Sequence, residues 1–199
     1  MTDAALAPER LPVGAIERRG LGWWGLLCLI ATEGALFFYL LFSYFYFDVQ
    51  MHREWLPREL PSLGLALPNT AILLLSSVAA WIGERGVRRG ARWQLLLGLL
   101  GALVLGAVFV SIQLMEWQSR AASIRASTYG SMYYTVTGFH MAHVVVGLAV
   151  LLMVLVWSAL GYFDRRRNAP VLIGNAYWHF VDAVWLAVFT TFYITPRLW

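Results

Sequence analysis

The chain has 199 residues, of which 60% are hydrophobic and 13% are charged, and its formal net charge at pH 7 is +4. With a mean hydropathy of +0.64, this composition excludes an ordinary soluble domain and indicates an integral membrane protein. The single cysteine, Cys28, excludes an intrachain disulfide, an iron–sulfur cluster and a cysteine-based zinc site.

Five apolar runs follow one another along the chain, and each is long enough to cross a bilayer core of about 30 Å as a helix. The alternating pattern of a transmembrane β-strand is absent. The sequence therefore predicts an all-α, polytopic membrane protein with a single membrane domain over residues 1–199. The first 20 residues are expected to form a cytoplasmic tail. The spans are predicted at residues 21–47, 63–82, 93–115, 132–160 and 176–194.

The orientation in the membrane follows from arginine, because all fifteen basic residues are Arg. Five spans place the two termini on opposite sides of the membrane. With a cytoplasmic N-terminus, ten arginines lie inside and five outside, as expected because basic loops resist translocation. The C-terminus is then periplasmic. The sequence pI near 9.5 reflects this topology and contacts with anionic lipid headgroups, and not nucleic-acid binding.

Two of the few ionisable side chains in the predicted spans lie at a similar depth. Glu33 lies roughly 15 Å into the first span, near the midplane, and His143 lies within about one helical turn of that depth in the fourth. The two side chains are therefore able to face each other. An ionisable group at this depth costs at least about 2.5 kcal/mol, so it is neutral, paired or beside water. Two interpretations of Glu33 stay open: a protonated carboxyl that bonds between helices, or a proton-linked or lipid-contacting group.

The histidines of the last two spans also allow two interpretations. His140 and His143 are three residues apart and share one helix face. His179 and Asp182 repeat this spacing, so that imidazole and carboxyl are able to share a proton. Interhelical hydrogen bonds, worth about 0.6 kcal/mol each on average, are a sufficient explanation. The alternative is a two-histidine haem b membrane anchor, with His179 opposite His140 or His143, although it leaves the third histidine unexplained.

Two features bear on how the third and fourth spans pack. Glu116, at the outer end of the third span, is expected to reach toward the membrane surface or to bond Tyr133 and Tyr134. Gly138 and Ala142 form a small-xxx-small face that favours close contact between helices. The fourth span is therefore predicted to lie in the interior of the bundle.

Four segments resemble subunit III of the haem-copper respiratory oxidases, in the family's own order. YGSMYYTVTGFHMAHVVVG (129–147) and NAYWHFVDAVWLAVFTTFYI (175–194) are similar to the last two helices of that subunit. ATEGALFF (31–38) resembles its S-E-x-x-F-F helix with two substitutions, and NTAILLLSS (69–77) resembles the next helix. The resemblance covers nearly all of the predicted spans. It implies the short, five-span form of the family, which lacks the first two helices of the seven-span form.

The resemblance implies an accessory subunit of a bacterial terminal oxidase that carries no redox centre. Such a subunit packs against the catalytic subunit I in the inner membrane, together with subunit II and phospholipids, and supports the reduction of O₂ to water coupled to proton translocation. Haem and copper are expected in the partner subunits, and no catalytic, cofactor-binding or metal-binding residue is expected in this chain. Cytochrome c is the expected electron donor. A quinol oxidase or a nitric-oxide-reductase-associated homologue is the alternative.

The resemblance also assigns family positions to the polar residues of the spans. Glu33 corresponds to the family's intramembrane carboxylate. His140 and His143 correspond to its G-F-H-x-x-H pair. His179 and Asp182 correspond to its W-H-F-x-D motif. The imidazoles are therefore expected to tie helices together.

Overall fold

The computed structural model describes residues 21–52, 54–57, 60–119 and 127–198, and all regular secondary structure in these ranges is helical. Five helices are long and apolar enough to cross a membrane, which confirms the predicted all-α fold with five spans. The expected cytoplasmic tail lies outside the described residues. The helices are α1 (Leu21–Gln50), α2 (Leu63–Arg89), α3 (Arg92–Ser119), α4 (Thr128–Ala159) and α5 (Ala169–Phe189), which continues through the π-helical turn η2 (Thr190–Ile194) into α6 (Thr195–Leu198).

Several helices extend beyond the apolar runs that predicted them, because their last turns carry polar and basic residues. α2 continues past residue 82 to Arg89 and ends where Gly90 adopts a left-handed conformation with a φ of 73°. The N–H of Gly90 bonds back to carbonyls of α2, so the chain reverses at once into α3. α5 begins at Ala169 with Pro170 in its first turn, where a missing N–H costs least.

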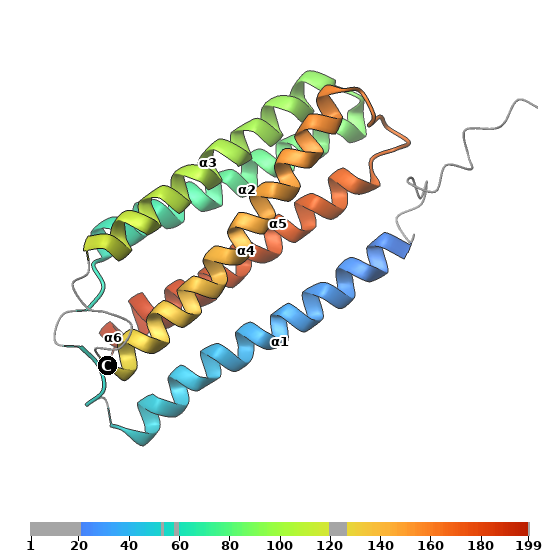
Figure 1. Ribbon diagram of the computed structural model, residues 1–199. Helices are drawn as coiled ribbons and strands as arrows, with labels where there is room; N and C mark the ends of the chain where they lie inside the picture. Colours follow the sequence, from blue (N-terminus) through green and yellow to red (C-terminus); the bar gives the residue numbers. More distant parts are fainter. Residues whose placement is uncertain (1–20, 53, 58–59, 120–126, 199) are drawn as a thin grey trace, which may run out of the picture.

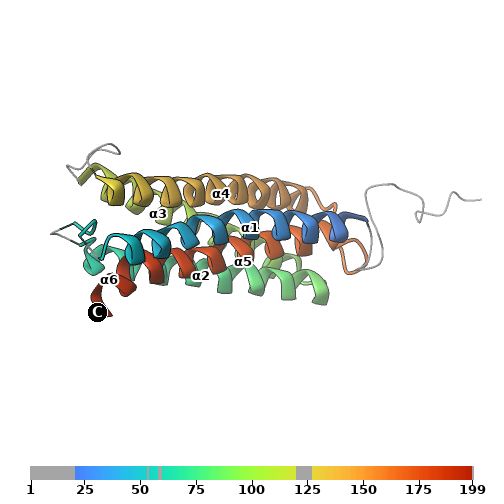
Figure 2. The ribbon, with the colours of Figure 1, turned by 90° about the horizontal axis from the view of Figure 1, so that it is seen from below.

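The helices run side by side as an elongated bundle. Figure 1 shows α2 and α3 as one close pair, α4 and α5 beside them, and α1 along the side away from that pair. Seen from below, α1 lies along α5 (Figure 2), against which most of its helix contacts are made. The beginning of α1 and the C-terminus lie at opposite ends of the bundle (Figure 1), as five spans require.

α4, which the sequence predicts to lie in the interior of the bundle, packs against α1, α3 and α5, but the most buried span is the C-terminal one. In its most apolar window 56% of the residues are buried, against 33% in that of α4. The small-residue face of α4 makes no close contact, because nothing lies within 4 Å of a Cβ added to Gly138 and Ala142 is exposed. α4 instead approaches its neighbours at Gly147, where an added Cβ would lie 2.8 Å from the indole of Trp178.

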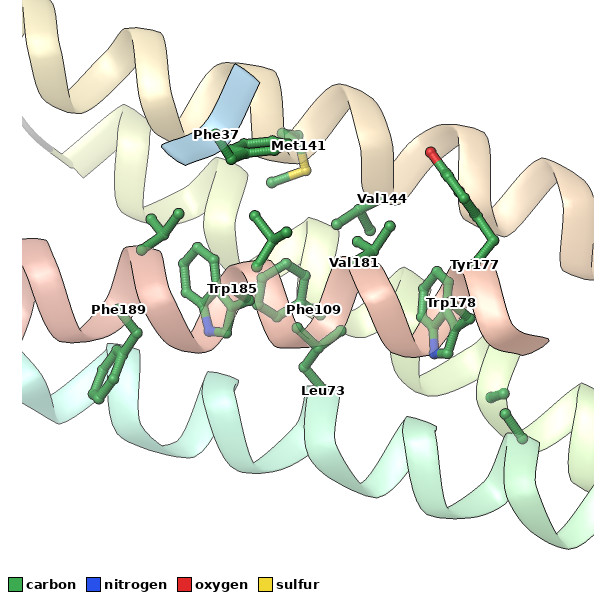
Figure 3. Close-up of a cluster of buried hydrophobic side chains, with 14 of the residues drawn as sticks. Phe37, Leu73, Phe109, Met141, Val144, Tyr177, Trp178, Val181, Trp185 and Phe189 are labelled. Atoms are coloured by element: carbon green, nitrogen blue, oxygen red, sulfur yellow. The ribbon is translucent and has the colours of Figure 1, made fainter. Parts of the chain in front are cut away.

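Two tryptophans fix the rotation of α5 within the bundle. Trp178 and Trp185 are fully buried, and in Figure 3 both indole nitrogens point toward α2. Trp178 Nε1 donates to Ser76 Oγ at 3.0 Å, and Trp185 Nε1 donates to Thr70 Oγ1 at the same distance. Gly106 of α3 leaves room for the indole of Trp178, since a Cβ added to this glycine would lie 2.8 Å from the ring. Buried indoles need such acceptors, so the bonds hold one face of α5 against α2.

The loop between α4 and α5 is organised by the carboxylate of Asp164. Oδ1 accepts hydrogen bonds from the backbone N–H groups of Arg167 and Arg166, both at 2.7 Å. These bonds, with that of Arg167 the larger contribution, lower the pKa of Asp164, because they favour the ionised form. The turn therefore keeps a negative charge next to three consecutive arginines.

Candidate functional site

The carboxyl of Glu33 and the imidazole of His143 meet between α1 and α4, as their similar depths predicted. Glu33 Oε2 lies 3.0 Å from His143 Nε2. The two side chains keep 28% and 16% of their exposure, respectively. Counted from Leu21, Glu33 lies roughly 18 Å along α1. An ionisable pair therefore sits deep in the membrane, with part of its surface uncovered by this chain.

The second nitrogen of His143 shows how many protons the pair holds. Nδ1 lies 2.7 Å from the carbonyl oxygen of Phe139, and because a carbonyl only accepts, Nδ1 must carry a hydrogen. With a neutral imidazole, Nε2 accepts and Glu33 carries the proton. With an imidazolium, Nε2 donates to the carboxylate. Both states are electrically neutral with one shared proton, which is what the membrane interior favours. The Nδ1 hydrogen is therefore held by the carbonyl of Phe139, and one further proton is shared across the contact between Nε2 and Oε2.

An apolar groove of about 380 Å³ opens beside this pair. The rings of Phe37 and His143 pack edge to face, with their centroids 5.0 Å apart. The side chains around the pair are therefore suited to hydrocarbon and not to water. The groove is lined by Leu26, Leu29 and Glu33 of α1, Ala142, His143, Val146 and Val150 of α4, and Ile173, Gly174 and Tyr177 of α5.

His140 lies one turn before His143 but points into the centre of the bundle. It is fully buried, and its ring centroid lies 4.9 Å from that of Trp185 and 6.1 Å from that of Phe109. Neither ring nitrogen has a hydrogen-bond partner among the described residues. Both histidines touch the ring of Phe37, but their other neighbours differ. His140 and His143, which are expected to share one helix face, therefore share only the contact with Phe37.

His179 and Asp182 converge on a third side chain, Ser77 of α2. The Ser77 hydroxyl lies 2.7 Å from His179 Nδ1 and also bonds to Asp182 Oδ2. Asp182 is 3% exposed, whereas His179 is only partly buried. A hydroxyl therefore connects the imidazole to the carboxyl. The order differs from that of a serine nucleophile, in which the histidine lies between serine and aspartate.

The three imidazoles of the spans are directed to different helices. His143 bonds Glu33 of α1, His179 bonds Ser77 of α2, and His140 packs among aromatic rings. The facing histidine pair of the haem-anchor alternative is not formed by this packing. In the part of the chain that the structure describes, no group of three or more His, Cys, Asp or Glu residues is arranged to hold a metal ion.

Glu116 takes part in a buried network at the C-terminal end of α3. The Tyr193 hydroxyl lies 3.0 and 3.1 Å from its two oxygens, and the Tyr133 hydroxyl lies 3.5 Å from one of them. Glu116 is 2% exposed, so its side chain is packed inside this chain and does not extend from the surface of the bundle. The predicted bond to Tyr133 is present, but Tyr134 packs its ring against Trp117 instead. The network ties α3 and α4 to the segment after α5.

Sequence reasoning missed Ser77 and Tyr193, which bond to the acidic groups Asp182 and Glu116, respectively. Both are polar side chains inside apolar spans, and that is a usable signal. Ser77 lies in the segment 69–77, which was singled out only for its resemblance. The choice of partner depends on how the helices are rotated against one another, which residue spacing along one helix does not specify.

Comparisons with known proteins agree with the motifs. The family model described as cytochrome c oxidase subunit III matches residues 14–196. The chain is 31% identical over 185 residues to the probable cytochrome c oxidase subunit 3 of Nocardia farcinica (strain IFM 10152), which covers 91% of each protein. It is 31% identical over 182 residues to cytochrome c oxidase subunit 3 of Thermostichus vulcanus, with 87% of each protein covered.

An animal relative shows how the lengths compare. The chain is 32% identical over 176 residues to cytochrome c oxidase subunit 3 of Artemia franciscana, which covers 85% of this chain and 67% of that protein. The bacterial relatives are therefore matched over most of their length, and the animal relative over about two-thirds. The chain belongs to the cytochrome c oxidase subunit III family.

Proposed function

We propose that this chain is a non-redox accessory subunit of a bacterial cytochrome c oxidase. It packs against subunit I in a complex that also holds subunit II, and these partners carry the haem and copper at which O₂ is reduced. The observation that carries this proposal is the family match over residues 14–196. The names of the three relatives specify cytochrome c, which favours it over quinol as the electron donor of the complex.

Within this role, we assign a proton-linked function to Glu33 and His143. Their 3.0 Å hydrogen bond holds one shared proton at zero net charge. The proton is able to move between the two side chains without a change in net charge, whereas its release leaves one negative charge that a proton from another donor must neutralise. The apolar groove beside the pair has the lining of an acyl-chain site, and a phospholipid is its proposed occupant. In this way the subunit supports proton supply to subunit I during sustained turnover.

The test compares wild-type and Glu33→Gln complexes at matched haem content. Glutamine keeps the shape and most hydrogen bonds but removes the titratable group, so assembly should be unchanged. Oxygen uptake should decline faster during turnover, and most at alkaline pH, where protons are scarce. Glu84→Gln is the control, because Glu84 is a carboxyl at the end of α2 that pairs with Arg88. Superimposable traces for wild type and Glu33→Gln would leave Glu33 a helix-packing residue.

We also propose that the chain crosses a bacterial inner membrane with its N-terminus in the cytoplasm. The support is the arginine count of ten against five. A reporter fused after Trp199 should read periplasmic, and one inserted near Arg88 should read cytoplasmic. The opposite pattern in both fusions would reverse the topology. It would also move the loop of Asp164 to the periplasm.

A further inference from the structure

A pocket lined by arginines lies at the end of the bundle where α1 begins. Figure 1 shows the turn between α2 and α3 and the loop between α4 and α5 at this end, and Arg165 of the loop bonds across to Arg89 at the end of α2. The two segments enclose a cavity of about 340 Å³, which shares no lining residue with the groove beside Glu33. We call this cavity the arginine pocket. It is therefore separate from the proton-linked pair.

Two arginines of the pocket are held in place by main-chain carbonyls of other segments. Arg165 donates from Nε to the carbonyl oxygen of Arg89 at 2.8 Å, and its Nη2 donates to the same oxygen. Arg92 donates from Nη2 to the carbonyl oxygen of Ala159 at 2.6 Å. A guanidinium group has five N–H donors, and these bonds use two of them in Arg165 and one in Arg92. Both groups are therefore positioned in advance and keep N–H donors for a further acceptor.

The backbone around the guanidinium groups is shaped to hold them. A Cβ added to Gly90 would lie 2.6 Å from Arg165 Nε, so only glycine leaves room for this approach. The turn organised by Asp164 is closed further by Asn168, whose Nδ2 donates to the carbonyl oxygen of Arg165 at 2.8 Å. Arg166 follows in the same turn and also lines the pocket. The loop therefore presents two neighbouring arginines from a hydrogen-bonded turn.

The charge of the lining favours an anion. Arg92, Arg165 and Arg166 contribute three positive charges, and Asp164 contributes one negative charge, which leaves +2. The negative charge of Asp164 is already engaged, because its Oδ1 accepts two backbone N–H groups of its own turn. Guanidinium groups form paired hydrogen bonds with the oxygens of phosphate. The pocket therefore has the donors and the charge to hold a phosphate group.

The depth of the pocket and its apolar wall indicate what carries the phosphate. Arg89 is the last residue of α2 and Arg92 is the first of α3, so the pocket lies where two spans end, at the level of lipid headgroups. Val87, Leu95 and Phe163 form an apolar wall beside the arginines. Basic pockets between transmembrane helices are known to bind phospholipid headgroups. A free inorganic anion would leave the apolar wall without a partner, whereas a phospholipid supplies both parts.

We propose that the arginine pocket binds the headgroup of an anionic phospholipid. The phosphate oxygens accept from the guanidinium groups of Arg92, Arg165 and Arg166, and the glycerol end of the lipid lies against the apolar wall. The net charge of +2 favours an anionic headgroup over a zwitterionic one. This site is distinct from the acyl-chain groove beside Glu33, and the inference does not rest on the accessory role.

Native mass spectrometry of the purified full chain in detergent measures the binding. The probes are phosphatidylglycerol, phosphatidylcholine with the same acyl chains, and inorganic phosphate. Phosphatidylglycerol should bind about fivefold more tightly than phosphatidylcholine, and added salt should weaken its binding. Equal binding of the two lipids would overturn the inference, as would displacement of phosphatidylglycerol by inorganic phosphate. Absence of the lipid from the intact complex would show that a protein segment covers the pocket, and the inference would fail.

Two neighbouring arginines provide a matched pair of variants. Arg166 lines the pocket and Arg167 does not, yet both bond to Asp164 through backbone N–H groups, which glutamine retains. Arg166→Gln should weaken phosphatidylglycerol binding about fivefold, and Arg167→Gln should weaken it less than about twofold. Arg165→Lys keeps the charge but loses the planar fork, so it should also bind more weakly than wild type. Equal effects of Arg166→Gln and Arg167→Gln would show a general attraction to surface charge and would overturn the site.

Discussion

α1 and the α2–α3 pair are held in the same bundle by different means. Only 11% of the residues in the most apolar window of α1 are buried, against 33% in those of α2 and α3. α2 and α3 meet backbone to backbone, since a Cβ added to Gly98 would lie 2.4 Å from the Gly83 nitrogen. On α1, by contrast, a Cβ on Gly25 would meet nothing within 4 Å. α1 is attached by aromatic rings and by one ionisable pair.

The difference shows two ways to associate helices where hydrocarbon surrounds them. Lipid tails are as apolar as leucine, so the hydrophobic effect does not drive α2 and α3 together; close van der Waals contact does, and it requires glycine. α1 lacks such close backbone contacts. It is held by the packing of side chains and by a hydrogen bond. Its buried side chains are Leu26, Phe37 and Tyr44, and the Glu33–His143 bond is its polar attachment. Three predictions test this contrast, in descending order of expected effect.

The largest effect is expected where the backbones touch. Gly98→Ala forces a methyl group against the backbone of α2, so the free energy of unfolding should fall by about 3 kcal/mol or more. Gly25→Ala on α1 is the control and should be neutral or stabilising, because alanine favours helix by about 1 kcal/mol over glycine. SDS titration of the purified chain in mixed micelles measures both. If the Gly98→Ala and Gly25→Ala variants had the same free energy of unfolding, α2 and α3 would be able to separate at little cost.

An intermediate effect is expected at the polar attachment of α1. His143→Leu leaves the Glu33 carboxyl without its partner and should lower the free energy of unfolding by about 2 kcal/mol. Replacing both residues by Leu removes the unpaired group as well, so the double variant should regain more than half of that loss. The same SDS titration completes the cycle with Glu33→Leu. Strictly additive losses would show that the pair does not hold α1.

The smallest effect is expected from a single hydroxyl in the network of Glu116, Tyr133 and Tyr193. Tyr193→Phe removes the donor to Glu116 and should cost about 1 kcal/mol. Tyr134→Phe is the matched control, because Tyr134 packs its ring against Trp117 without a hydrogen bond to any described residue; it should change little. Thermal unfolding of the two variants, monitored by tryptophan fluorescence, separates them. A larger loss for Tyr134→Phe than for Tyr193→Phe would contradict the assignment.

The amino-acid sequence is sufficient to predict the features that depend on distance along one helix. Run length and apolar composition predicted five spans, because the bilayer sets how many residues a helix needs. Residue count also placed Glu33 and His143 at one depth, and the structure brings them to 3.0 Å. Helix ends were less predictable, since basic and polar turns such as that of Arg89 continue a helix after its apolar run has ended.

Which side chains meet across helices depends on how the helices pack, and residue spacing does not predict it. Gly138 seemed suited to close packing, yet α4 packs through Gly147 because the indole of Trp178 lies there. Asp182 was paired with His179 by spacing alone, whereas Ser77 of another helix connects them. Spacing specifies the face of one helix, but the rotation of its neighbour results from all the interhelical contacts together. In this bundle Trp178 and Trp185 fix that rotation by bonding to α2.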